Sequence, residues 1–216
     1  HDKNLQQLLT LSIPIILGTS LEQINILIDR TVASGVGEGA ITILNYAAKL
    51  NGAMLSLSVM VILSILYPKF SHLVSENNIN ELKIQVKYII NMIFIFSIPT
   101  MCGIIVLKKE VSMFIFGRGN LDKNSVLSIA KCLSAYSLCF VALCLRDLAT
   151  KIFYSFKDSK TPVINSSIGI GLNIILNIIL SKYLGIIGIA LATSVSTIFI
   201  SILLFWKVVI DYFIFL

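Results

Sequence analysis

The chain has 216 residues, of which 56% are hydrophobic and 13% are charged, and its mean hydropathy is +0.92. This composition is too apolar for an ordinary soluble domain of that length and predicts an integral membrane protein. The net charge is +6, but the 17 basic residues are scattered over short polar segments without forming a basic face, so we expect no nucleic-acid partner.

Apolar segments of about 20 residues, long enough to cross a hydrocarbon core of about 30 Å, follow one another along the chain. Backbone groups in lipid must be hydrogen-bonded within the protein, and the segments lack the alternation of barrel strands, so we predict helices. The expected fold class is all-α, a polytopic membrane helical bundle of about six transmembrane helices. We place them in one domain, residues 1–210, with 211–216 starting a further segment. The predicted spans are about 8–32, 41–67, 88–107, 126–150, 162–183 and 187–208.

The first span carries an unusual number of polar residues. Gly18, Glu22, Asn25 and Asp29 recur at helical spacing, which puts them on one face of the helix. Such a face is expected to lie against a wet cavity. The alternative is that Asp29 pairs with Arg30 or another basic residue near the membrane surface.

A second polar face lies on the second span, where Thr42, Asn45, Lys49, Gly52 and Ser56 share one side of the helix. An ammonium at membrane depth costs at least about 2.5 to 3.5 kcal/mol on insertion scales, so it is expected to face other helices, water or a ligand. A compact ammonium suits a diphosphate or a carboxylate as a point charge. The alternative is a lysine that snorkels to the interface.

Short signals mark two of the connections. Asn78 lies three residues before Glu81, a spacing typical of a capping box, and predicts the start of a short amphipathic helix before the third span. Gly185 and Gly188 leave little room for a loop between the last two spans, so these spans are expected to form a tight antiparallel hairpin.

The fifth and sixth spans carry amides and hydroxyls that can meet if the hairpin is tight. Asn173 and Asn177 are one helical turn apart, Thr193 adds a hydroxyl, and Asp29 adds one negative charge if the first span packs beside them. Oxygen ligands with a single carboxylate suit a hard monovalent cation such as sodium, and no other cofactor is expected. The alternative is interhelical hydrogen bonding that only supports packing.

Four collinear segments resemble one family, the MurJ (MviN) lipid II flippases of the multidrug/oligosaccharidyl-lipid/polysaccharide exporter superfamily. The segments are QINILIDRTVASGVGEGAITILNYAAKL from Gln23 to Leu50, FGRG from Phe116 to Gly119, FYSFKDSKTPV from Phe153 to Val163, and LGIIGIALATS from Leu184 to Ser194.

This resemblance implies a bundle of fourteen transmembrane helices in two lobes, of which the chain is similar to helices seven to twelve. The N-terminal lobe of the same protein is then an expected partner, and the start at His1 fits a fragment. The family flips lipid II, an undecaprenyl-diphosphate-linked peptidoglycan precursor, across the bacterial cytoplasmic membrane by alternating access. The resemblance therefore implies transport for cell-wall biogenesis and cell shape, with no enzymatic activity.

The resemblance also implies roles for particular residues. Lys49 stands where the family commonly has an essential arginine, Thr42 stands where a serine is common, and both lie with Asn45 in the expected substrate cavity. Lysine lacks the bidentate fork of arginine, and Ala48 replaces an acidic residue. The positions that look like a sodium site in some members are Asp29, Asn173, Asn177 and Thr193. Motif residues expected to contribute to gating are Arg30, Arg118, Lys157, Asp158, Lys160 and Pro162.

Three other functions compete with this interpretation. A related exporter of the superfamily could carry another lipid-linked oligosaccharide or a drug. A membrane transferase acting on prenyl phosphates would need paired carboxylates or a histidine base, and Glu22 is the only intramembrane acidic partner expected for Asp29. A membrane scaffold without transport activity is the third.

Overall fold

The computed structural model describes residues 3–57, 61–118 and 121–214, and every regular element in these ranges is helical. This confirms the all-α class. The elements are α1 (Lys3–Ser34), α2 (Ala40–Leu55), α3 (Val61–Ser75), α4 (Ile79–Val106), α5 (Lys108–Phe116), α6 (Lys123–Ser137), α7 (Phe140–Ser155), α8 (Lys160–Leu184), α9 (Ile186–Val208) and the π-helical turn η2 (Val209–Ile214).

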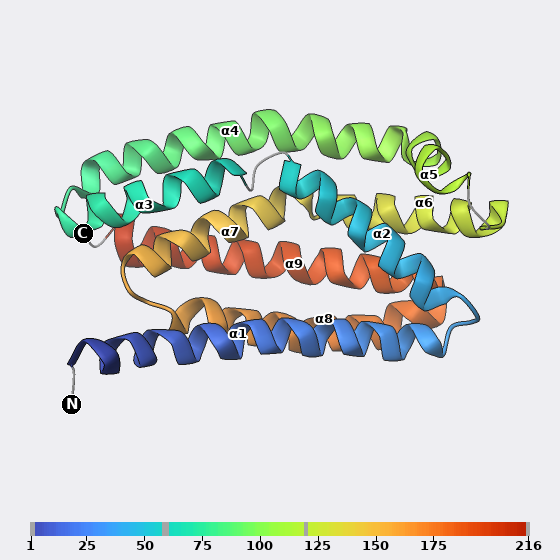
Figure 1. The fold of residues 1–216 in the computed structure, drawn as a ribbon, viewed down its shortest axis with the longest axis horizontal. Helices are drawn as coiled ribbons and strands as arrows, with labels where there is room; N and C mark the ends of the chain where they lie inside the picture. Colours follow the sequence, from blue (N-terminus) through green and yellow to red (C-terminus); the bar gives the residue numbers. More distant parts are fainter. Residues whose placement is uncertain (1–2, 58–60, 119–120, 215–216) are drawn as a thin grey trace.

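The helices form an elongated bundle in which α9 lies between two sets of helices (Figure 1). On one side α8 packs against α9, and α1 packs against α8. On the other side α6 and α7 pack against α9, with α4 beyond them. The fully buried side chains include Phe70 of α3 and Phe140 and Phe153 of α7, which belong to the apolar core. Large apolar side chains such as Ile95 and Ile202 are exposed, as is expected where helices face lipid.

Three helices of the described ranges are long and apolar enough to cross a membrane: Ile79–Val106, Lys160–Leu184 and Ile186–Tyr212. The pair α6 and α7 makes a fourth candidate if it counts as one span. The predicted span 41–67 covers α2 and part of α3, which have 16 and 15 residues and are each shorter than the bilayer core requires. The division into six spans within one domain therefore stays a prediction.

The predicted span 126–150 is a pair of helices bent by 46° between α6 and α7. At the bend the amide of Leu138 donates to the Ala135 carbonyl and that of Cys139 donates to the Tyr136 carbonyl. These hydrogen bonds join residues three apart instead of the four of a regular α-helix. They tighten the turn and change the direction of the helix without a proline.

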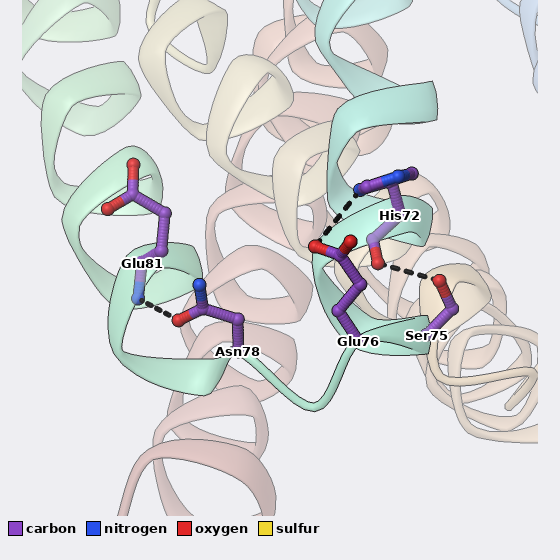
Figure 2. Close-up of polar contacts among 5 residues, drawn as sticks. All are labelled: His72, Ser75, Glu76, Asn78 and Glu81. Carbon is purple, nitrogen blue, oxygen red and sulfur yellow. Dashed lines mark hydrogen bonds and ion pairs between the residues drawn. The ribbon is translucent and has the colours of Figure 1, made fainter.

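The turn between α3 and α4 is held by polar contacts (Figure 2). Asn78 Oδ1 accepts a hydrogen bond of 3.2 Å from the Glu81 amide, which confirms the expected helix start. On the other side, His72 Nδ1 lies 3.3 Å from Glu76 Oε2, and the Ser75 hydroxyl donates to the His72 carbonyl. The prediction of a separate short helix is wrong, because α4 continues without a break to Val106.

The hairpin of α8 and α9 is as tight as predicted, with Gly185 as the single residue between the helices. Gly185 has φ 58°, a left-handed value that side chains rarely adopt. A Cβ on Gly188 would lie 2.1 Å from the Leu180 carbonyl oxygen, and one on Gly169 would lie 1.7 Å from Ile200 Cδ1. Glycine is therefore needed at position 188, where a Cβ would meet backbone, and at position 169 a larger residue would displace the Ile200 side chain.

Candidate functional site

The polar face of α2 lies opposite its buried face. Thr42, Lys49, Gly52 and Ser56 are exposed, and Asn45 is half-buried. The side of α2 that packs on the bundle is apolar and contributes Ile43, Leu44, Ala47 and Leu50 to the core. The periodicity thus places Lys49 on the uncovered face of a helix whose other face is anchored.

One hydrogen bond connects this face to α1. Arg30 Nη2 donates to Asn45 Oδ1 over 3.3 Å, so a guanidinium reaches the same side of α2 as the lysine. Lys49 itself has no hydrogen-bond or ion-pair partner within the described ranges. The two cations can therefore both act on a ligand placed over α2, and this role stays a prediction.

A second group of polar side chains lies where α1, α8 and α9 meet. Asn177 Nδ2 lies 2.6 Å from Asp29 Oδ1 and 2.8 Å from Asn173 Oδ1. The Thr193 hydroxyl lies 3.5 Å from Asp29 Oδ2 and 3.4 Å from Asn173 Nδ2. The structure thus brings together the four side chains predicted as a cation site, which we call the oxygen cluster (Asp29, Asn173, Asn177 and Thr193).

The oxygen cluster holds more acceptors than donors. Asn177 Oδ1 is buried and has no hydrogen-bond partner among the described residues. The Asn173 amide fits better when turned over, which would put its nitrogen 3.1 Å from Asp29 Oδ1 and 3.0 Å from Asn25 Oδ1. In the orientation that keeps the hydrogen bond from Asn177 Nδ2 to Asn173 Oδ1, a carboxylate, a hydroxyl and the Asn177 Oδ1, which has no partner among the described residues, lie together. A hard cation would satisfy such a set of oxygens.

A polar crevice, consisting of two adjoining pockets, runs along α1 beside the oxygen cluster. The inner pocket, about 250 Å³, is lined by Asn173, Thr193 and Asn25, among others. The outer pocket, about 290 Å³, is lined by Asp147, Thr150, Tyr154 and Pro162, among others. Three residues line both pockets: Glu22 of α1, Arg146 of α7 and Ser166 of α8.

An ion pair joins α1 to α7 at the point where the pockets meet. Arg146 Nη2 lies 3.7 Å from Glu22 Oε1. Arg146 and Asp147 were not predicted from the sequence; Asp147 lines the outer pocket together with Glu22. Adjacent arginine and aspartate residues within an apolar block were the signal that could have found them.

The other predicted motif residues lie in or beside connections between helices: Lys157, Asp158, Lys160, Pro162 and Arg118. Asp158 Oδ1 accepts hydrogen bonds of 3.0 Å from the amides of Lys160 and Thr161 and so caps the start of α8. Pro162 is buried and lines the outer pocket. Arg118 follows α5 and lies over the ring of Phe114, 5.7 Å from its centre. A gating role for this group stays a prediction.

The sequence of the chain is similar to those of known proteins. The family model described as lipid II flippase MurJ matches residues 1–210. The chain belongs to this family. It is 33% identical to the "Probable lipid II flippase MurJ" of Vibrio cholerae over 90% of the chain and 37% of that protein. It is 32% identical to the protein of the same name in Rickettsia prowazekii, over 91% of the chain and 38% of that protein.

Solved structures agree with membership of the MurJ family. A lipid II flippase MurJ in an inward closed conformation matches with a TM-score of 0.82 and 28% identity, over 91% of this chain and 41% of that one. A MOP superfamily transporter from Pyrococcus furiosus shares the fold with a TM-score of 0.80 at 15% identity, over 95% of this chain and 44% of that one. The chain spans about two fifths of the length of the curated relatives and of the MurJ structure that it matches.

Proposed function

We propose that this chain forms most of the C-terminal lobe of a lipid II flippase, and that the whole protein moves the head group of an undecaprenyl-diphosphate-linked precursor across the cytoplasmic membrane without catalysing a reaction. Membership of the family and the names of its relatives support this substrate. The remaining helices of the protein, including the N-terminal lobe, complete the cavity around the lipid head group.

The observation that carries the proposal is the position of Lys49 on α2. The helix is fixed to the bundle by its apolar face, so the ammonium is held on the face that no described helix covers. A cation there is costly beside lipid and favourable beside a diphosphate. Arg30, bonded to Asn45 on the same face, adds a second positive charge. The face therefore suits the anionic part of lipid II.

We further propose that the oxygen cluster binds sodium. Asp29 supplies the charge, and the unpaired Asn177 Oδ1 is an acceptor that a cation would satisfy. A bound ion would tie α1 to α8 and α9. If sodium binds the inward-facing or the outward-facing conformation more tightly, it shifts the populations of these two conformations by that difference in affinity.

The test of the flippase role is complementation of a cell depleted of its own flippase by the full-length protein. Lys49→Ala is expected to abolish growth because the diphosphate loses its contact, while Lys49→Arg, which keeps the charge, is expected to support it. Lys87→Ala, at an exposed position on α4, is the matched control and is expected to grow normally. Membrane insertion of each variant is checked by immunoblot. Normal growth with Lys49→Ala would contradict the proposal.

A further inference from the structure

The crevice beside the oxygen cluster runs along the helices from one end of the bundle. Its outer pocket is lined by Tyr154, one residue before the end of α7, and by Pro162, in the first turn of α8. Its inner pocket reaches Asn173, which lies 13 residues after the start of α8, about 20 Å along a helix that rises about 1.5 Å per residue. The crevice therefore leads from the end of the bundle where α7 connects to α8 towards the oxygen cluster near the middle of α8.

The ion pair between Glu22 and Arg146 lies at the junction of the two pockets. Its separation of 3.7 Å is longer than the roughly 2.7–2.9 Å of a charge-assisted hydrogen bond, so the pair is loose. The side chains are 57% and 25% exposed, respectively, so both face open space. A charged pair in this position can separate without disturbing the packed core.

We infer that Glu22 and Arg146 form an electrostatic gate that controls the entry of a hydrated monovalent cation from the outer pocket to the oxygen cluster. This inference rests on the proposed sodium site. An ion moving inward passes between the carboxylate, which attracts it, and the guanidinium, which repels it. Asp147 lines the outer pocket beside Arg146 and offers the guanidinium a second carboxylate when the pair opens.

The two gate residues act on a cation in opposite directions. Removing the charge of Arg146 leaves a net attraction in the crevice and accelerates entry. Removing the charge of Glu22 leaves an unpaired guanidinium, which slows the entry of the cation. Fixed charges that line a low-dielectric cleft change association rates by about tenfold or more. A pair that only held α1 against α7 would affect both variants in the same direction.

The experiment measures the sodium association rate and affinity of the full-length protein by ²³Na NMR exchange. Arg146→Gln is expected to raise the association rate about tenfold and Glu22→Gln to lower it about tenfold, with smaller changes in Kd. The double variant is expected to return close to the wild-type rate. Arg146→Lys keeps the charge and is expected to stay near the wild type. If Arg146→Gln does not fold, Arg146→Lys and Glu22→Gln still provide the test.

Lys182→Gln is the matched control, because it removes one positive charge from an exposed position near the far end of α8. Its sodium association rate is expected to be unchanged. Equal rates in all variants, or shifts of the two single variants in the same direction, would overturn the gate while leaving the sodium site in place. A wild-type protein that binds no sodium would instead refute the proposed site and the gate with it.

Discussion

Replacement of Asp29 by asparagine tests the sodium site through protein stability. The substitution preserves the size of the side chain and removes the only carboxylate of the oxygen cluster. Asn177 Nδ2 keeps its 2.8 Å hydrogen bond to Asn173 Oδ1 if the Asn173 amide is not turned over. Losing a hydrogen bond to a charged group costs about 1.5–3 kcal/mol, but a half-buried charge is removed as well. Without sodium, we therefore expect a net change of about 1 kcal/mol or less.

The effect with sodium present is larger. A wild-type site at a sodium concentration 100 times its Kd gains about 2.7 kcal/mol of stability by linkage. Opposite unit charges about 4 Å apart interact by about 4 kcal/mol near a protein surface, so loss of the carboxylate is expected to weaken binding at least about 100-fold. At the same sodium concentration the variant then keeps only about 0.4 kcal/mol.

The assay is thermal unfolding of the purified full-length protein over a series of sodium concentrations, with the chloride concentration held constant by N-methyl-D-glucamine. Wild type is expected to gain stability with sodium, and Asp29→Asn is expected to lose that dependence. Asp211→Asn is the matched control, because Asp211 is exposed on η2. An undiminished response to sodium in Asp29→Asn would refute the reasoning.

Two further predictions concern the fold. Gly169→Val is expected to destabilise the α8–α9 hairpin by about 1–3 kcal/mol in thermal unfolding, since a Cβ would clash with Ile200. Gly171→Val is the control, because there is open space around Gly171, and it is expected to change stability little beyond the effect of helix propensity. Asp122 caps the start of α6, and hydrogen bonds from the Ser125 side chain first, and then from the Ser125 amide, hold its pKa below the ordinary value. Its stabilising effect is complete above the unfolded-state pKa of about 3.9 and is lost as pH falls through the lower folded-state pKa. Asp122→Asn is expected to remove this acid-side dependence, and an unchanged acid transition would contradict it.

Helical spacing and turn residues allowed much of the site to be predicted. The 3.6-residue period puts Lys49 opposite the apolar residues of α2, and a helix fixed by that apolar face leaves the lysine uncovered. The single-residue connection at Gly185 makes α8 and α9 antiparallel neighbours, so Asn173 and Thr193 face each other. The approach of Asp29 from α1 depended on packing between distant segments, which was stated in the sequence analysis only as a condition.

Other features of the structure could not be predicted from local sequence patterns. The bend between α6 and α7 involves neither proline nor glycine at Leu138 and Cys139, so composition could not indicate it. Arg146 was visible in the sequence, but its pairing with Glu22 requires α7 to pack near α1, and these helices are far apart along the chain. The continuity of α4 from its cap at Asn78 was missed because its first turns are polar and were interpreted as a separate element.

The most direct test of the central claim is translocation of fluorescent lipid II by the full-length protein in proteoliposomes. Wild type and Lys87→Ala are expected to move the lipid between leaflets, and Lys49→Ala, reconstituted in equal amount, is expected to give only the rate of protein-free vesicles. Translocation by Lys49→Ala at the wild-type rate would show that this lysine does not hold the diphosphate.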